Sequence, residues 1–548
     1  MRFLPVNLSA FMVELPSLEQ TMALTDSLTY RPIKGIEEIT PAARTVLVRY
    51  NPAIEHVNAI VQQISQRNIE SGEFKTGKLV TIPVHYTGED LPEVAEYLGV
   101  SIEEVIRRHT ESEYLVAFSG FAPGFGYMVS KQAQLQVPRR QSPRVRIPAG
   151  SVALAGEFSS VYPQASPGGW QLIGQTDLAV WDINRPEPAL LQAGYRVQFV
   201  DQSKSPVSYS LPSHTDIKSI NENQNSINEN QNSIDKSQTY DLTVLATGLQ
   251  TLFQDRGRIG QSALGISESG AMDKSALYSA NRLVGNCTQS TVLEVTQGGL
   301  KVRANRDLLV GITGAECSVT ITTEDGQIYT SETYQPIHLA KGDVIQLGRP
   351  TKGVRSYFAV RGGFSVTPVL ESCSFDTLAQ VGPAPLMVGQ SLSIYQKANH
   401  RAISLSESPA FDYPTADDVV VLDVVMGPRT DWFTEQAAEL LRQQVWQVTA
   451  ASNRIGLRLA GEVPLSRELL QELPSEGTCT GAIQVPANGQ PVLFLNDHPL
   501  TGGYPVIGAV CDYHLDLAGQ IPVNGKIRFN PLREFYQLEG SHEAYEYQ

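Results

Sequence analysis

The chain has 548 residues, too many for one hydrophobic core, so we expect about two to four domains. A hydrophobic content of 41% with 18% charged residues is typical of a globular protein and excludes a disordered or fibrous chain. The formal net charge of −15 argues against nucleic acid or an anionic membrane as the main partner, because both carry negative charge themselves.

Cysteine usage and hydropathy indicate the compartment. The five cysteines have no CxxC spacing, and their odd number argues against a disulfide framework. The sequence does not open with a charged region followed by a long apolar run, and no apolar run approaches the roughly 20 residues that span a bilayer. We therefore expect a soluble, cytoplasmic protein that binds neither nucleic acid nor a membrane.

The first region, 1–78, is predicted to be a small α/β domain. The stretch RTVLVRY at 44–50 has the composition of a β-strand. Along 54–67, apolar residues recur at steps of three and four, which predicts a helix whose buried face consists of Ile54, Val57, Ile60, Val61 and Ile64. No residues in this region have the pattern of a catalytic site.

The second region, 79–202, is predicted to be mostly β. Between 118 and 176, glycine and proline recur around short apolar stretches, which indicates strands joined by tight corners. The stretch 91–110 is predicted to form two short helices around Gly99, the second capped by Ser101 with Glu104 three residues later. His109 lies at the end of the second helix, where the helix dipole favours an imidazolium, so it is either a cap or a catalytic residue.

A group of arginines gives this second region a candidate anion site. Four of them fall within eight residues, near Ser151 and the Gly168–Gly169 turn: Arg139, Arg140, Arg144 and Arg146. Forked guanidinium donors and the exposed N–H groups of glycine turns would bind a phosphate or a carboxylate if they converged on one concavity. The alternative is that the arginines are spread along a solvated strand face.

The stretch 203–240 is predicted to be a disordered linker. The heptapeptide NENQNSI occurs there twice in tandem, at 221–227 and 228–234, in a run with almost no large apolar residues. Such a run cannot bury enough surface to offset the entropy lost on ordering it. Its position suggests two formerly separate polypeptides joined head to tail.

Two motifs in the last region, 241–548, combine charged residues with glycine, and a helix is expected at 276–283 between them. The motif QDRGR provides either a buried Asp–Arg pair that holds a turn or a substrate site, formed by Asp255, Arg256 and Arg258. In NDHPLTGGYP, the bend at Gly502 and Gly503 would let the backbone approach a ligand, beside Asp497, Thr501 and Tyr504.

No metal site is predicted, because His498 and His514 lack partners at ligand spacing. A phosphate-binding GxxxxGK[ST] loop is also absent. Any nucleotide would have to be held by another arrangement of arginines and backbone N–H groups.

Long motifs in both halves resemble known families. FSGFAPGFGYM at 118–128, VPRRQSPRVRIPAGSVALAG at 137–156, SPGGWQLIGQT at 166–176 and the stretch 82–110 resemble allophanate hydrolase subunit 1, a family that includes the B subunit of bacterial 5-oxoprolinase. The stretches 249–286 and 481–510 resemble allophanate hydrolase subunit 2, a family that includes the C subunit. Both halves together resemble the carboxyltransferase region of urea carboxylase. One departure is that Pro499 and Leu500 precede Thr501, where the family often has a Gln-Thr or Thr-Thr pair.

The resemblance implies a mainly β fold with α+β parts, in which each half contains a cyclophilin-like β-barrel beside the small N-terminal domain. It also implies an ATP-dependent 5-oxoprolinase component that uses ATP with Mg. Phosphorylation of the lactam oxygen of 5-oxo-L-proline would make the ring carbon open to water, and a separate A-subunit-like partner would complete hydrolysis to L-glutamate. We expect the two halves to meet in one cleft whose cations neutralise the activated lactam.

Under this hypothesis the predicted catalytic residues are His109, Arg144, Asp497 and Tyr504. The predicted substrate- or nucleotide-binding residues are Arg139, Arg146, Ser151, Gly168, Gly169, Asp255, Arg256, Arg258, Thr501, Gly502 and Gly503.

Two alternatives stay open. In the first, the chain is a carboxyltransferase that acts on urea or a related amide and receives its carboxyl group from biotin on a partner, because the chain has no biotinyl Met-Lys motif. In the second, it is a non-catalytic regulator of a histidine kinase. A homo-oligomer is compatible with all three hypotheses.

Overall fold

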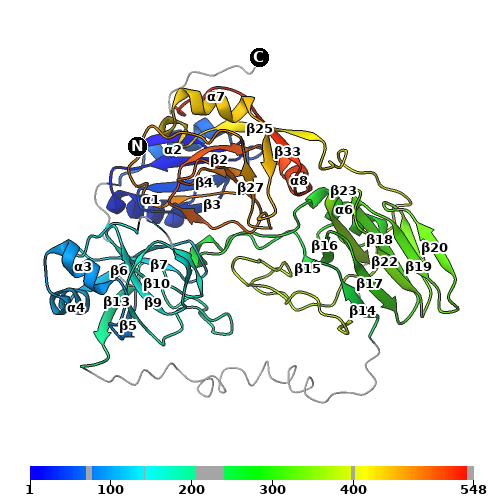
Figure 1. Ribbon diagram of the computed structural model, residues 1–548, viewed down its shortest axis with the longest axis horizontal. Helices are drawn as coiled ribbons and strands as arrows, with labels where there is room; N and C mark the ends of the chain where they lie inside the picture. The colour runs from blue at the N-terminus through cyan, green and yellow to red at the C-terminus, as the bar shows by residue number, and fades with distance from the viewer. Residues whose placement is uncertain (70–76, 141, 143, 205–239, 396–400, 540–548) are drawn as a thin grey trace.

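The computed structural model describes residues 1–69, 77–140, 142, 144–204, 240–395 and 401–539. Most of the predicted linker at 203–240 lies outside these residues. Strands dominate the described chain, and its helices are short (Figure 1). Within these ranges, no helix has the length and apolar character needed to cross a membrane.

The N-terminal domain is a four-stranded antiparallel sheet, ordered β1-β2-β4-β3, with two helices. The predicted strand at 44–50 is confirmed, but the predicted helix begins only at Val57, because His56 caps it. Ile54 therefore lies outside that helix and is exposed. The elements are β1 (Arg2–Pro5), β2 (Ala10–Glu14), α1 (Leu18–Tyr30), β3 (Ile36–Pro41), β4 (Thr45–Tyr50) and α2 (Val57–Ser65).

Both faces of this N-terminal sheet are buried. Side chains alternate along a strand, so Phe11 and Val13 of β2 pack with α1 and α2, whereas Ala10 and Met12 face the opposite way. This second face packs against Ala509 in the last domain of the chain. The first domain is thus completed by residues from the far end of the sequence.

The second domain is a nearly closed barrel. Its seven strands follow the order β12-β9-β10-β7-β6-β13-β5, and an isolated bridge between His85 and Gln175 joins the two edge strands. The strands are β5 (Leu79–Val84), β6 (Glu113–Ser119), β7 (Gly126–Val129), β9 (Ser151–Ala155), β10 (Phe158–Val161), β12 (Gln171–Gln175) and β13 (Arg196–Asp201). A separate ribbon consists of β8 (Arg144–Ile147) and β11 (Ser166–Gly168).

The two predicted helices of this barrel are confirmed as α3 (Leu91–Leu98) and α4 (Ile102–Glu111). Gly99 ends α3 in the left-handed conformation, at φ 66°. Ser101 caps α4, since its hydroxyl accepts a hydrogen bond from the Glu104 backbone N–H at 3.2 Å.

The third domain packs two antiparallel sheets face to face. Their orders are β20-β19-β22-β17-β14-β24 and β15-β16-β23-β18-β21, and the predicted helix at 276–283 is confirmed within α6 (Lys274–Leu283). The strands are β14 (Leu242–Thr247), β15 (Gln250–Gln254), β16 (Val292–Thr296), β17 (Leu300–Ala304), β18 (Leu308–Glu316), β19 (Val319–Thr322), β20 (Ile328–Ser331), β21 (Pro336–Leu339), β22 (Val344–Leu347), β23 (Lys352–Val360) and β24 (Ser391–Leu392).

The fourth domain is a closed barrel, ordered β25-β32-β29-β30-β27-β26-β33. It comprises β25 (Val419–Met426), β26 (Trp446–Val448), β27 (Gly456–Ala460), β29 (Ala482–Gln484), β30 (Val492–Phe494), β32 (Val506–Val510), β33 (Lys526–Pro531), α7 (Glu435–Gln443) and α8 (Leu515–Ala518). A short pair, β28 (Glu476–Gly477) and β31 (Thr501–Gly502), lies beside it. Together with the barrel of the second domain, this confirms the predicted mainly β fold with a barrel in each half.

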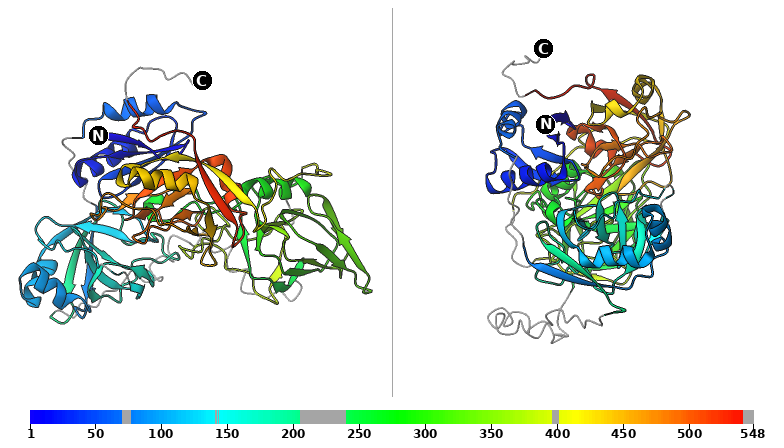
Figure 2. Two further views of the ribbon diagram at one scale, coloured as in Figure 1. Left: turned by 45° about the horizontal axis from the view of Figure 1, so that its top comes forward. Right: turned by 90° about the vertical axis from the view of Figure 1, so that its left-hand side faces the viewer.

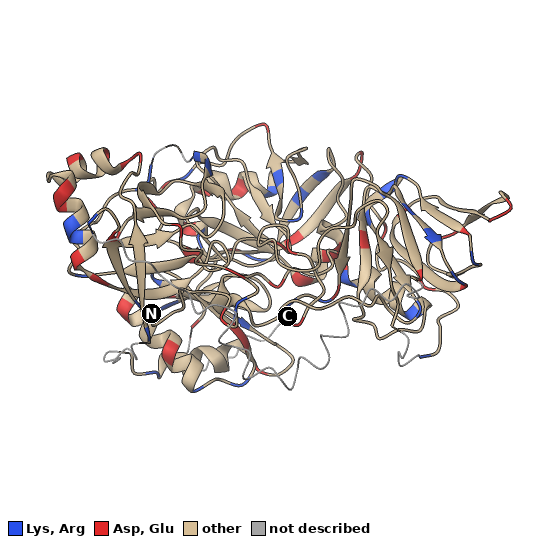
Figure 3. Cartoon of the chain, turned by 90° about the horizontal axis from the view of Figure 1, so that it is seen from below, with Lys and Arg blue, Asp and Glu red and all other residues tan. Residues whose placement is uncertain are grey.

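The four domains do not follow one another along a line. The N-terminal domain lies against the C-terminal barrel, and the second and third domains lie at opposite ends (Figures 1 and 2). Charged side chains of both signs are interspersed along the whole molecule (Figure 3). The joint between the first and last domains is therefore one of the places where the two halves of the sequence meet.

Candidate active site

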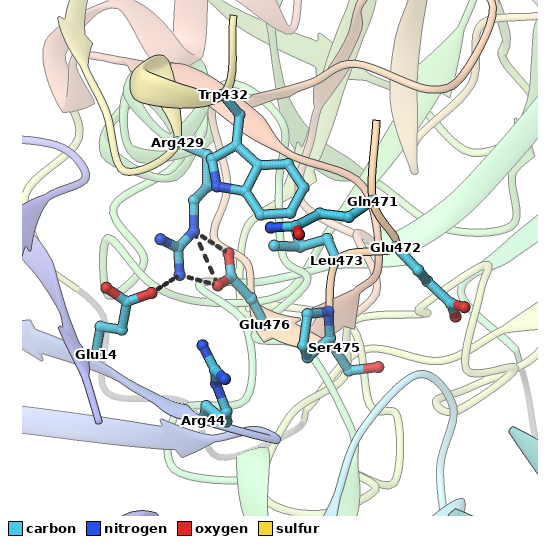
Figure 4. Close-up of a pocket in the computed structure, with 10 residues that line it drawn as sticks. Glu14, Arg44, Arg429, Trp432, Gln471, Glu472, Leu473, Ser475 and Glu476 are labelled. Carbon is cyan, nitrogen blue, oxygen red and sulfur yellow. Dashed lines mark hydrogen bonds and ion pairs between the residues drawn. The ribbon is translucent and has the colours of Figure 1, made fainter. Parts of the chain in front are cut away.

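A cavity of about 190 Å³ lies between the N-terminal domain and the C-terminal barrel (Figure 4). The first half of the chain supplies two of its lining residues, Glu14 and Arg44. The second half supplies the others, which are Arg429, Trp432, Gln471, Glu472, Leu473, Pro474, Ser475 and Glu476. Neither half forms this cavity alone.

Backbone contacts fix the two walls against each other. Arg44 lies in the turn before β4, and the Ala43 N–H donates a hydrogen bond to the Ser475 carbonyl at 3.0 Å. A β-carbon on Gly477 would lie only 2.7 Å from the β-carbon of Leu47, so glycine is needed for this close approach. The wall 471–476 is therefore held against the N-terminal sheet.

One wall of the cavity contains an arginine with two carboxylate partners. Arg429, which is 3% exposed, contacts Glu476 through Nε at 2.9 and 3.0 Å and Glu14 through Nη2 at 2.7 Å. Burial alone would lower the pKa of Arg429, but its hydrogen bonds to Glu476 and the charges of both carboxylates raise it. Burial raises the pKa of Glu476, although Arg429 partly offsets this rise.

Arg44 differs from Arg429 because its guanidinium makes no hydrogen bond or ion pair with the described part of the chain. Its side chain is exposed and points into the cavity (Figure 4). A free guanidinium beside a hydroxyl and an amide, from Ser475 and Gln471, can bind a small molecule that carries a carboxylate and an amide group.

The second domain reaches the cavity wall through the predicted residue Arg139. Its Nε lies 3.0 Å from Glu472, and its Nη2 donates to the Ser475 hydroxyl at 3.1 Å. A β-carbon on Gly503 would lie 2.0 Å from Arg139 Nη1, so the Gly-Gly bend gives this arginine its space. Arg139, Thr501, Gly502 and Gly503, predicted from separate motifs, are thus brought together beside the cavity.

Thr501 joins this group through a short chain of hydroxyl groups. The Tyr127 hydroxyl lies 3.3 Å from the Thr501 hydroxyl and 3.4 Å from the Ser475 hydroxyl. All three side chains are buried. Tyr127 and Thr501 lie outside the lining of the cavity and position its wall, whereas Ser475 itself lines it.

The other arginines do not form the predicted anion site. Arg140 and Arg144 both bind Asp90, which is 2% exposed, at 2.6 Å and 2.7 Å, and each has a second carboxylate, Glu93 at 3.6 Å and Glu89 at 3.0 Å, so carboxylates of the chain already face both guanidinium groups. Arg146 is exposed on β8 and, unlike Arg140 and Arg144, makes no ion pair with Asp90. The predicted catalytic role of Arg144 is not supported, because a buried carboxylate occupies its donors.

The other predicted residues of this set are part of the barrel's packing. Ser151 is buried at the start of β9. Gly168 gives space to the Tyr162 hydroxyl, which would lie 2.4 Å from a β-carbon there. The Gly169 carbonyl accepts a hydrogen bond from the Arg140 N–H at 2.7 Å.

The predicted catalytic role of His109 is contradicted by its lack of access to solvent, because the side chain is fully buried within the barrel. Its two ring nitrogens lie 2.7 Å from the Tyr86 hydroxyl and 2.9 Å from the Ser159 hydroxyl, and its ring stacks on Phe199. Burial lowers the pKa of His109 to about 3, so the imidazole is neutral. It neither caps the helix as a cation nor reaches a substrate.

The QDRGR motif holds a turn, but among the described residues no hydrogen bond or ion pair joins Asp255 to Arg256 or Arg258, so the predicted Asp–Arg pair is not formed. The Asp255 carboxylate accepts hydrogen bonds from the Ser372 hydroxyl at 2.6 Å and the Cys373 N–H at 2.6 Å. Arg258 is 2% exposed and donates to the Ser374 carbonyl. Arg256 is exposed and lies outside the lining of the cavity.

Asp497, predicted to be catalytic, is instead sealed between the third and fourth domains with no exposed surface. Its two oxygens accept hydrogen bonds from Nε and Nη2 of Arg454, each at 2.9 Å, and Arg454 also binds Glu294 of β16. Burial alone would raise the pKa of Asp497, but Arg454 outweighs burial and lowers it. Tyr504 is 37% exposed and stacks beside Arg467, outside the lining of the cavity.

Sequence reasoning named none of the ten residues that line the cavity, among them Glu14, Arg44, Arg429, Trp432, Gln471 and Glu476. Arg429 follows a Gly-Pro corner after a strand, in MGPRTDW at 426–432, which is the same kind of signal that drew attention to the other motifs. Glu14 and Arg44 carry no such signal, because each is an isolated charge at the end of a strand.

ATP, which the resemblance implies, does not fit this cavity. A volume of 190 Å³ holds about six water molecules and is smaller than the roughly 300–1,000 Å³ of pockets for larger ligands. Three carboxylates line it, from Glu14, Glu472 and Glu476, and would repel a triphosphate. The described residues also contain no group of three or more side chains placed to hold a metal ion.

Comparison with known proteins identifies relatives of both halves. The family "Carboxyltransferase domain, subdomain C and D" matches residues 1–191, and "Carboxyltransferase domain, subdomain A and B" matches residues 264–531. The chain is 33% identical to the 5-oxoprolinase C subunit of Escherichia coli K12 over 291 residues, which cover 53% of this chain and 90% of the relative. It is 39% identical to the 5-oxoprolinase B subunit of Escherichia coli O157:H7 over 200 residues, 35% of this chain and 89% of the relative.

A solved structure matches nearly the whole chain. The crystal structure of TTHA0988 superposes with a TM-score of 0.77 at 30% identity, over 95% of this chain and 99% of the other. The arrangement of all four domains is therefore shared with a protein determined by experiment.

Proposed function

Because this chain belongs to the carboxyltransferase-domain family and joins a part similar to the 5-oxoprolinase B subunit to a part similar to the C subunit, we propose that it is the lactam-binding component of an ATP-dependent 5-oxoprolinase. In this reaction 5-oxo-L-proline is activated and hydrolysed to L-glutamate. A separate A-subunit-like protein acts with the chain and completes ring opening.

The observation that carries the proposal is the small cavity shared between the two halves. Its size suits a single five-membered ring with one carboxylate. Arg44 would bind that carboxylate, because its guanidinium makes no hydrogen bond or ion pair in the described chain and Glu157 acts on it only from beyond ion-pair distance. The Ser475 hydroxyl and the Gln471 amide would bind the lactam group, and the indole of Trp432 would cover the ring.

The wall around Arg429 contributes a fixed electrostatic environment. An unstrained amide is a poor electrophile, so its opening needs donors aimed at the oxygen on which negative charge develops. Arg429 is held by Glu14 and Glu476 and does not need to reorganise when a ligand enters. Its position is thus suited to orienting and stabilising the bound lactam.

The nucleotide is a separate part of the proposal. Since the cavity does not fit ATP, it accounts for lactam binding and not for nucleotide binding. We expect ATP, with Mg, to bind elsewhere in the assembled enzyme.

The test is to mix the purified chain with ATP and 5-oxoproline, with and without the purified A-subunit-like protein, and to measure ADP and glutamate. We expect substrate-dependent ADP release with the wild-type chain and its loss in Arg44→Ala, while Arg146→Ala serves as the matched control. Absence of substrate-dependent ADP in every wild-type mixture would refute the function.

A second function is favoured by the family description itself, which names a carboxyltransferase. Under this alternative, biotin on a partner protein would deliver a carboxyl group to urea or a related amide in the same cavity. Transfer of labelled carboxyl from a biotinylated partner to urea, with no ADP formed from 5-oxoproline, would favour this alternative over the first.

A further inference from the structure

A second hollow, of about 410 Å³, lies on the C-terminal barrel, and we call it the outer hollow. It is lined by Pro464, Leu465, Ser466, Arg467, Leu470, Ala487, Asn488 and Gly489. The Leu465 N–H donates to the Gly489 carbonyl at 2.9 Å and ties its two loops together. Gly489 has φ 71°, and a β-carbon there would lie 2.7 Å from the Leu465 carbonyl oxygen, so the shape of the hollow depends on glycine.

The outer hollow contains an arginine without a counter-charge. Arg467 makes no ion pair with the described residues, its Nη2 donates to the Val485 carbonyl, and its Nε is buried without a hydrogen-bond partner there. Its guanidinium carbon lies 5.6 Å from the centre of the Tyr504 ring. An incoming carboxylate would therefore find a cation that no carboxylate of the described chain neutralises.

Large apolar side chains surround this arginine at the surface. Leu470 is 86% exposed, and Val463, Leu469 and Tyr504 are 49%, 39% and 37% exposed. Exposed leucine and tyrosine side chains beside a half-buried arginine mark a surface for another macromolecule. A small ligand would leave most of Leu470 in water.

One continuous segment of the chain contributes to the lining of both the outer hollow and the active-site cavity. Residues 464–470 line the hollow and residues 471–476 line the cavity. The backbone N–H groups of Glu468 and Leu469 donate to the Trp432 carbonyl at 3.0 and 3.4 Å, and Trp432 itself lines the cavity. A partner bound in the hollow would therefore lie next to the substrate.

We propose that the outer hollow docks the A-subunit-like protein through a segment that presents a carboxylate between apolar side chains. The carboxylate would pair with Arg467, and the apolar side chains would cover Leu470 and Tyr504. This inference rests on the proposed function, in which an activated lactam has to pass to the partner without exposure to bulk water. Docking beside the cavity wall gives the shortest such path.

The experiment measures the dissociation constant between the full-length chain and the purified A-subunit-like protein by isothermal titration calorimetry. We expect Leu470→Asp and Arg467→Glu to raise it about tenfold or more. Leu405→Asp is the matched control, because Leu405 is 80% exposed but lies outside the hollow, and its dissociation constant should equal that of the wild type.

Three results would overturn the docking site: no binding by the wild-type chain, unchanged binding by both hollow variants, or self-association of the chain that is lost in Leu470→Asp. Binding of 5-oxoproline to each variant without the partner is measured in parallel. We expect Leu470→Asp to bind it like the wild type. If the wild-type chain does not bind 5-oxoproline, the proposed function is refuted. If the chain binds 5-oxoproline and only the partner titration fails, the docking site alone is refuted.

Discussion

The cavity beside Arg44 and the network around Asp497 are both built from arginines and carboxylates that meet across a domain boundary. In the network, Arg454, Asp497 and Glu294 are at most 2% exposed, and the two carboxylates face Arg454 and the nearby Arg355, whose Nε lies 3.6 Å from Glu294. In the cavity, Arg429 is likewise held by carboxylates, but Arg44 makes no hydrogen bond or ion pair in the described chain and is open to solvent, with Glu157 acting on it only from beyond ion-pair distance. An unmatched charge with access is what distinguishes a binding site from a structural joint.

The strongest test of this comparison is a substitution in the sealed network around Asp497. We expect Arg454→Ala to lower the free energy of unfolding by about 3–5 kcal/mol, because it leaves Asp497 buried without its cation and leaves Glu294 with Arg355 alone, at 3.6 Å. Urea denaturation monitored by circular dichroism measures this loss. A change under about 1 kcal/mol would mean that water reaches the network, and the contrast with the cavity would fail.

The reverse result is expected in the cavity. Arg44→Ala should leave the unfolding curve nearly unchanged, because the side chain makes no hydrogen bond or ion pair with the described chain, but should weaken 5-oxoproline binding. A charge-assisted hydrogen bond contributes about 1.5–3 kcal/mol, so the dissociation constant should rise about tenfold to hundredfold in calorimetry. The dissociation constant of Arg44→Lys, which keeps the charge, should lie between those of the wild type and Arg44→Ala. Equal affinity for all three proteins would contradict the assigned role.

The dependence of stability on pH sharpens the comparison further. Asp376 is a buried carboxyl group, 1% exposed, that accepts a hydrogen bond from the Ser267 hydroxyl at 2.9 Å and lies near enough to Asp497 to be affected by its charge. Burial and then the charge of Asp497 raise the pKa of Asp376 to about 7, whereas an unfolded chain gives about 3.9. The folded state therefore holds a proton on Asp376 between these values, and the stability that this proton provides falls as the pH rises from about 4 to about 7. We expect a decline of about 1 kcal/mol per pH unit relative to Asp376→Asn, measured by urea titrations at several pH values. Parallel curves for the two proteins would show that Asp376 ionises normally.

The smallest effect is expected for the arginine group that sequence reasoning favoured. Arg146→Ala should change the free energy of unfolding by less than about 0.5 kcal/mol and leave lactam binding and ADP release unchanged, because the side chain is exposed on β8. A large loss of ADP release in this variant would show that the nucleotide binds at β8 after all.

Much of the fold could be predicted from local pattern. The strand-like composition of RTVLVRY identified β4, Gly99 and Ser101 marked the end of α3 and the start of α4, and the helix at 276–283 was found. The start of α2 was placed too early, because Ile54 continued the apolar period while His56 provided the cap. Periodicity reports which face is apolar, but a cap decides where the helix begins.

The candidate site was predicted in part. The glycines at 502 and 503 pointed to a close approach, which is the approach of Arg139 from another domain. The same motif also suggested Asp497 as catalytic, and His109 was chosen for its place at a helix end. Both are buried, because burial is set by contacts with distant segments such as β16 for Asp497 and Phe199 for His109. Local sequence carries no record of those contacts.

The packing of the N-terminal sheet against Ala509 has a consequence for biosynthesis. At about 5–20 residues per second, a ribosome needs roughly 25–90 s to make the roughly 460 residues between Leu47 and Ala509. During that time the apolar face that includes Leu4, Met12 and Leu47 has no covering partner from its own chain. Nascent chains of this protein should therefore depend on a chaperone until the last barrel emerges. Pulse-labelling in chaperone-depleted cells would reveal this dependence as aggregation of N-terminal fragments.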